Sequence, residues 1–107
     1  MYSDQPLQWV HVFRTELDAV QDLTITDDDS LQEAKAKDAN IRASADGAKR
    51  GSGQSAAGVA IMAYHRDGRR VLLHRSGRLL GNLQSAFLAE ALAMELCLKT
   101  LAELFLT

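Results

Sequence analysis

Two acidic residues, Asp46 and Glu90, are the strongest candidates for chemistry in this sequence. Asp46 ends the run IRASAD and precedes a basic, glycine-rich stretch, whereas Glu90 stands inside a long apolar run. A buried carboxylate without a partner is costly, and two carboxylates held close together repel unless they share a proton or a cation. Oxygen ligands favour Mg²⁺ or Mn²⁺ over zinc. Taken singly, Asp46 also fits an ordinary turn, and Glu90 also fits a solvent-exposed or arginine-paired position.

The elements around Asp46 and Glu90 are predicted to bring them together. IRASAD (41–46) has apolar residues at alternate positions, which is typical of a strand. The segment 56–77 carries Asp67-Gly68 between two apolar runs, a strong signal for a hairpin with a two-residue loop. The sequence therefore predicts a three-stranded antiparallel meander within an α+β fold. The residue pairs that a two-residue loop predicts are Arg66 with Arg69, Tyr64 with Val71 and Met62 with Leu73.

A long helix is predicted after the meander, in the stretch 85–106. Its Ala, Leu, Met and Glu content favours helix, and Ser85 is a natural N-cap. Little of its surface is polar over the first three turns, so we expect it to be buried against the sheet. Cys97 lies in this apolar run and is interpreted as a buried structural thiol. His65 and His74 lack a companion at ligand spacing and are interpreted as surface strand residues.

The N-terminal part differs in character. Apolar residues recur at helical spacing between Pro6 and Leu23, and a short polar helix with little to bury is predicted in TDDDSLQEAKAKD (26–38). The adjacent acids 27–29 are interpreted as caps and helix-dipole partners, although they resemble metal ligands. Residues 1–40 hold nine acidic and three basic side chains, whereas residues 41–80 hold two acidic and eight basic ones. The basic block suits an anionic ligand, or is a solvated hairpin surface.

Composition narrows the class of protein. At 107 residues the chain forms one domain at most, and its single cysteine excludes an internal disulfide and suits a reducing compartment. No apolar run approaches the roughly 20 residues of a membrane span, and the first ten residues lack the order of a signal peptide. We therefore expect a soluble, intracellular protein, either cytoplasmic or nuclear, with no membrane partner.

Three segments from about Ile41 onward carry a resemblance to a known family. They are ADGAKRGSGQSAAGVAI, HRDGRRVLL and SGRLLGNLQSAFLAEALAMEL, and they span about 65 of the 107 residues. Their order resembles the front half of a ribonuclease H domain, of the type found in retroelement polyproteins and plant reverse-transcriptase-like proteins. The segments match its first strand and glycine loop, its second strand, its hairpin into the third strand, and its first helix. Residues 1–40 resemble no family that we can name.

The resemblance implies an endonuclease, a hydrolase that cleaves the RNA strand of an RNA–DNA hybrid with two Mg²⁺ or Mn²⁺ ions. The acid of the family's Asp-Gly motif and the acid of its Ala-Glu helix are catalytic metal ligands, which here are Asp46 and Glu90. The glycine loop lets the backbone approach a phosphate or a sugar 2′-hydroxyl. The residues that the resemblance places against nucleic acid are Gly47, Ala48, Lys49, Arg50 and Ser85.

This sequence also departs from the family pattern. The family's third carboxylate ends the strand after this helix and a fourth comes from the last helix, whereas this chain stops at AELFLT. Glu95 and Glu103 lie on the helix and do not replace a ligand on a separate strand. The loop reads Ser52-Gly53-Gln54 instead of Asn-Pro-Gly and is one residue short.

These departures predict a partial ribonuclease H-like domain (41–107) after an acidic helical extension or connector (1–40), with impaired nuclease activity. Its partners are then an RNA–DNA hybrid, and the missing C-terminal half or a parent polyprotein. The alternative is a small non-catalytic α+β interaction module. That module would use its basic hairpin on an acidic partner, including its own acidic N-terminal segment.

Overall fold

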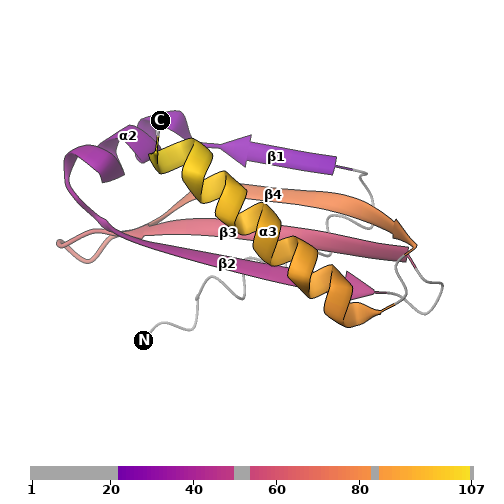
Figure 1. The fold of residues 1–107 in the computed structure, drawn as a ribbon. Helices are drawn as coiled ribbons and strands as arrows, with labels where there is room; N and C mark the ends of the chain where they lie inside the picture. Colours follow the sequence, from indigo (N-terminus) through magenta and orange to yellow (C-terminus); the bar gives the residue numbers. More distant parts are fainter. Residues whose placement is uncertain (1–21, 50–53, 83–84, 107) are drawn as a thin grey trace.

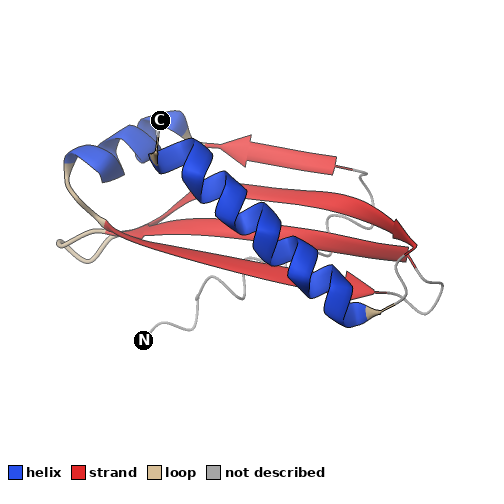
Figure 2. Ribbon diagram, viewed as in Figure 1, coloured by secondary structure: helices blue, strands red, loops and turns tan. Residues whose placement is uncertain are grey.

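The centre of the molecule is a four-stranded antiparallel sheet (Figure 1). The computed structural model describes residues 22–49, 54–82 and 85–106. Its strands are β1 (Asp22–Thr26), β2 (Asn40–Lys49), β3 (Gln54–Tyr64) and β4 (Arg70–Asn82), and its helices are α2 (Asp28–Ala36) and α3 (Ala86–Phe105). The strand order is β1-β4-β3-β2, and α3 crosses one face of the sheet (Figure 2). The predicted α+β class and antiparallel meander are confirmed, but three strands is wrong because β1 adds a fourth.

Strand β1 lies where the sequence indicated the end of a helix. Asp22 and Leu23 belong to this strand, and the rest of the predicted helix lies outside the described residues. β1 pairs with β4 from Asp22 opposite Arg78 to Thr26 opposite His74. This pairing satisfies backbone groups along an edge of β4 that β3 does not cover. The correction therefore comes from a long-range pairing that helical periodicity does not report.

Helix α2 begins at the acidic run, as predicted. The carboxylate of Asp27 is the N-cap and accepts hydrogen bonds from the backbone N–H of Ser30 (3.1 Å) and from its hydroxyl (2.9 Å). These bonds lower the pKa of Asp27. The expectation that this helix buries little is wrong, because Leu31 and Ala34 are buried in the core with residues of β3 and β4. Two apolar side chains, Leu31 and Ala34, therefore pack this short helix against the core.

The hairpin between β3 and β4 has a three-residue loop, not the predicted two-residue loop. The His65 N–H donates to the Arg69 carbonyl (2.9 Å), and the Gly68 N–H donates to the His65 carbonyl (3.0 Å). Gly68 has a φ of 96°, which a glycine adopts readily at the end of such a loop. The predicted pairs are therefore wrong by one residue, and Tyr64 lies opposite Arg70 while Met62 lies opposite Leu72.

A bulge farther along β4 shifts the register again. Ile61 lies opposite His74 whereas Met62 lies opposite Leu72, so Leu73 is an extra residue between the two pairs. Beyond this bulge the pairing becomes that of a two-residue loop. The consequence is that His74, and with it Ser76, takes a place on the face covered by α3.

Helix α3 packs on the sheet through small side chains. Ser85 is its N-cap, as predicted, and accepts from the Leu88 N–H (3.2 Å). The helix buries one narrow face, formed by Ala89, Ala93, Cys97 and Thr100. Burial of the thiol is confirmed for Cys97, and it raises the pKa of that group. Neither described helix is long and apolar enough to cross a membrane.

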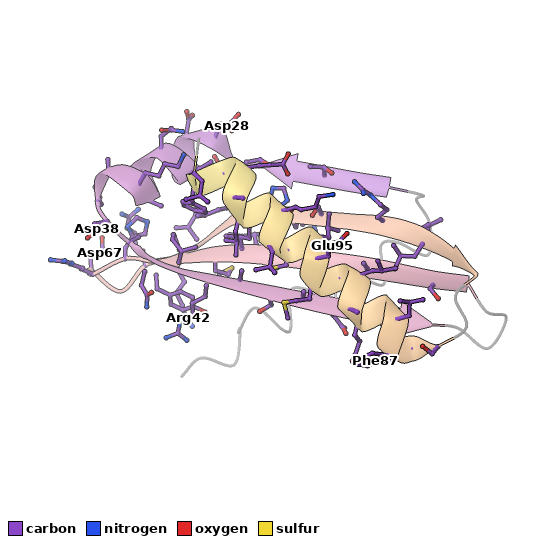
Figure 3. The ribbon with its side chains drawn as sticks, viewed as in Figure 1. Asp28, Asp38, Arg42, Asp67, Phe87 and Glu95 are labelled. Carbon is purple, nitrogen blue, oxygen red and sulfur yellow. The ribbon has the colours of Figure 1, made fainter. Side chains whose placement is uncertain are left out.

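The prediction that α3 is buried over its first turns holds for one face only. Phe87 is 79% exposed, Met94 53% and Leu98 60%, and Figure 3 shows Phe87 near the start of the helix. The small residues on the inner face bring the helix backbone close to the strands, which leaves the large apolar side chains on the outer face. The prediction that His65 and His74 are surface residues is also wrong, because both side chains are buried.

Candidate metal and nucleic-acid site

Strand β2 and helix α3 meet at Gly47. A Cβ placed on Gly47 would lie 2.5 Å from the backbone nitrogen of Glu90, and closer still to the carbonyl carbon and oxygen of Ala89. No side chain fits into so short a gap, so only glycine permits this crossing. The first turns of α3 therefore rest directly on the strand that carries Asp46.

The crossing brings the backbones of the two candidate ligands together. Asp46 precedes Gly47 on β2 and is partly buried, and Glu90 is exposed on α3. Side chains alternate along a strand, and Gly47 faces the helix, so the Cβ of Asp46 starts on the opposite face. β2 is the outer strand of the described sheet. A cation shared by the two carboxylates would therefore sit at the edge of β2 and not between the sheet and the helix.

The donor set fits a hard cation only in part. Two carboxylates supply the oxygen ligands that Mg²⁺ and Mn²⁺ prefer. Across residues 22–49, 54–82 and 85–106, no three His, Cys, Asp or Glu side chains gather in a group that could hold a metal ion. Mg²⁺ commonly binds through one or two carboxylates together with substrate phosphates, so phosphate oxygens and water would have to complete the shell.

The structure describes only some of the other residues that were expected to contact nucleic acid. Strand β2 ends with Gly47, Ala48 and Lys49. Of these three, Gly47 is the residue that the structure places against the backbone of α3. Arg50 lies outside the described residues. Ser85 is exposed, and its hydroxyl caps α3. Gly47 and Ser85 therefore both have structural roles at this end of the molecule, where β2 ends and α3 begins (Figure 1).

The arginines of the basic hairpin lie at the opposite end of the strands. Arg66, Arg69 and Arg70 are exposed, as expected for the tip of a hairpin. Arg69 is held by two acids, with its Nε 2.8 Å from Asp67 and an Nη 3.1 Å from Glu33 of α2. Together with Lys37, Arg69 lowers the pKa of Glu33 to about 2. Part of the basic charge is therefore already matched by the acidic segment of the same chain.

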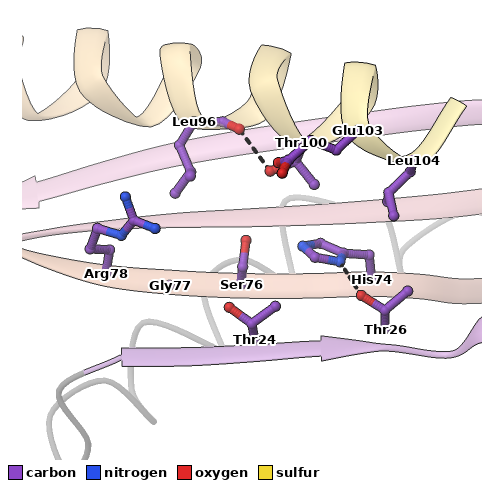
Figure 4. Close-up of a pocket in the computed structure, with 10 residues that line it drawn as sticks. All are labelled: Thr24, Thr26, His74, Ser76, Gly77, Arg78, Leu96, Thr100, Glu103 and Leu104. Carbon is purple, nitrogen blue, oxygen red and sulfur yellow. Dashed lines mark hydrogen bonds between the residues drawn. The ribbon is translucent and has the colours of Figure 1, made fainter. Parts of the chain in front are cut away.

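A polar pocket that the sequence did not predict lies between α3 and the strands β1 and β4. Thr24 and Thr26 of β1 and His74, Ser76 and Arg78 of β4 line it opposite the C-terminal half of α3 (Figure 4). The signal was present as polar residues at alternate positions, T-x-T at 24–26 and H-x-S-x-R at 74–78. Without the pairing of β1 with β4, nothing indicated that these two runs share a face.

Comparisons of the chain with protein-family models, with curated proteins and with solved structures found no match. The class that the fold itself defines is an α+β domain with an antiparallel sheet covered on one face by a helix.

Proposed function

We propose that this chain is a nucleic-acid-binding domain of the ribonuclease H type, in which Asp46 and Glu90 hold Mg²⁺ or Mn²⁺ against the backbone of an RNA–DNA hybrid. The observation that carries the proposal is the contact of Gly47 with the backbone of Ala89 and Glu90. The backbones that carry these two carboxylates, from elements far apart in the sequence, approach each other because a glycine follows Asp46. An ordinary turn residue at Asp46 would not require this close approach.

The arrangement of the elements also supports the proposal. An antiparallel meander leads into a helix that returns across the first of its strands, which is the order that the resemblance implies. Phosphate oxygens from a bound hybrid would complete a metal shell that two carboxylates leave open. Metal binding and hybrid binding are then coupled, each strengthening the other.

Paramagnetic Mn²⁺ tests the site directly in the 107-residue chain. With a hybrid present, we expect Mn²⁺ to broaden the amide signals around Asp46 and Glu90 before all others. Asp46→Asn and Glu90→Gln should each remove this selective broadening, because each removes a ligand charge. Glu95→Gln is the matched control, since Glu95 is exposed on the same helix and carries the same charge (Figure 3). Broadening that is unchanged in Asp46→Asn would refute the metal site.

Cleavage is a separate question. Two-metal hydrolysis needs cations held rigidly enough to position the water and the scissile phosphate. Because the described residues gather no third acidic ligand, we expect the 107-residue chain with Mg²⁺ to leave a labelled hybrid uncut. Adding the C-terminal half of a ribonuclease H domain of the same type should restore some cleavage, and Asp46→Asn should abolish it. Strong cleavage by the chain alone would mean that a further ligand completes the site.

The second candidate is a non-catalytic interaction module that uses the basic hairpin. The ion pair between Arg69 and Glu33 favours it, because it shows an acidic group seated on this hairpin. Arg66→Ala combined with Arg70→Ala should then weaken binding to an acidic partner and flatten its salt dependence. Binding that depends on these arginines but not on Asp46 or on Mn²⁺ would favour the module over the metal site.

A further inference from the structure

A pocket of about 330 Å³ lies between the C-terminal half of α3 and the strands β1 and β4 (Figure 4). It is separate from the crossing at Gly47, which involves β2 and the first turns of α3. Its volume is at the lower end of the range for small-molecule sites. Leu96 and Leu104 of α3 form its apolar wall, and the strands supply its polar groups.

Two polar atoms buried at this pocket lack a hydrogen-bond partner among the residues that the structure describes. Ser76 is 6% exposed and His74 5% exposed, and neither the Ser76 Oγ nor the His74 Nε2 makes a hydrogen bond within residues 22–49, 54–82 and 85–106. Figure 4 shows both side chains directed from β4 toward α3. Leaving such a group unsatisfied costs free energy, so these two atoms are positioned to bind water or the polar atoms of a ligand.

The charges and hydrogen bonds around these atoms select the ligand. The other nitrogen of His74, Nδ1, lies 2.7 Å from the Thr26 hydroxyl. If that hydroxyl donates, Nε2 carries the hydrogen and becomes a donor that faces the pocket. Arg78 adds a guanidinium on the same side of β4. The Thr100 hydroxyl is already committed to the Leu96 carbonyl (2.8 Å).

One carboxylate opposes a negatively charged ligand. Glu103 lines the pocket beside Thr100, on the side of His74 and away from Arg78 (Figure 4). The ligand's negative charge is therefore expected at the end of the pocket that Arg78 lines, away from Glu103. Burial lowers the pKa of His74, while Glu103 raises it, so the imidazole contributes mainly as a neutral donor near neutral pH.

We propose that this pocket binds a small oxyanion, the carboxylate or phosphoryl group of a small molecule, held by Arg78, the Ser76 hydroxyl and the His74 Nε2–H. This chemistry uses the guanidinium and both unpartnered buried atoms. It rests on neither the metal site nor the binding of nucleic acid.

Titration of the isotopically labelled 107-residue chain tests the proposal, with inorganic phosphate and acetate as separate probes at constant ionic strength. We expect saturable shifts of the backbone amide signals of Ser76 and Arg78, and an imidazole nitrogen spectrum in which Nε2 of His74 carries the hydrogen. Saturation by phosphate alone identifies a phosphoryl site, and saturation by acetate identifies a carboxylate site. Absence of saturable shifts with both anions would overturn the proposal and mean that ordered water fills the pocket.

Variants separate specific binding from general attraction to positive charge. Ser76→Ala should weaken anion affinity by about tenfold, the value of one hydrogen bond to a charged group. It should leave the thermal stability unchanged or higher, because it removes a buried hydroxyl that has no partner in the described part of the chain. A merely structural role for Ser76 would give the reverse pattern, with lower stability and unchanged affinity.

Arg78→Gln should likewise weaken anion binding by about tenfold or more, since it removes a charge-assisted hydrogen bond. Arg75→Gln is its control, because it removes the same charge from β4 at a position that alternation places on the opposite face. Equal losses in these two variants would show that only net charge matters and would refute the proposed site.

Discussion

Substituting alanine for Gly47 should separate β2 from α3. The added Cβ would lie 2.5 Å or less from backbone atoms of Ala89 and Glu90, and these atoms cannot rotate away as a flexible side chain would. Overpacking of this kind costs about 1–3 kcal/mol, and the rigid neighbours place this case near about 3. The lower conformational entropy of the unfolded alanine chain offsets about 0.4–1 kcal/mol of this cost. We therefore expect a net loss of about 2 kcal/mol.

Thermal unfolding followed by circular dichroism measures this loss. For a domain of this size, about 2 kcal/mol corresponds to a fall in Tm of about 8–16 °C. The double variant Gly47→Ala/Ala89→Gly should not recover it, because the contact is with the backbone of Ala89 and not with its methyl group. A change in unfolding free energy below about 0.5 kcal/mol, or rescue by Ala89→Gly, would show that the crossing is looser than described.

Three further outcomes are expected. Arg69 and Lys37 lower the pKa of Glu33 to about 2. The stabilising effect of the Glu33 carboxylate is therefore fully present above the ordinary pKa of 4.5 and is lost as the pH falls through about 2. Urea unfolding between these two pH values should show a smaller pH dependence for Glu33→Gln than for the unchanged chain. Ser85→Ala removes the N-cap of α3 and should cost about 1 kcal/mol in the same assay, whereas Ser85→Asp should retain most of the stability. Cys97 is buried with a raised pKa, so its alkylation by iodoacetamide should be slow in the folded chain and should accelerate in urea; equal rates would contradict its burial.

Local signals in the sequence predicted the features that depend on near neighbours. The caps of α2 and α3 are examples, since Asp27 and Ser85 each bind a backbone N–H three residues later. The hairpin was predicted at the correct place because Asp67-Gly68 favours a reversal of the chain. Its register was wrong by one residue because the same dipeptide also fits a three-residue loop, and the choice depends on how β3 and β4 pair over their whole length.

The candidate site was predictable as a pair of residues but not as a geometry. The types of Asp46 and Glu90 and their surroundings drew attention to them in the sequence. The alternation in 41–46 already set Asp46 apart from the apolar face, but the sequence did not indicate that Gly47 touches the backbone of α3. That contact depends on the distance between a strand and a helix, which the small residues facing the sheet determine together.

The amino-acid sequence by itself determined the meander, both helix starts and the buried thiol of Cys97, because these follow from capping, turn chemistry and apolar periodicity along short stretches. Only the tertiary structure decided that β1 pairs with β4, and that His74 and Ser76 are buried at a pocket. The physical reason is sequence separation. Thr26 and His74 are 48 residues apart in the sequence and meet because β1 pairs with β4. No local preference encodes which strand edge β1 will pair with.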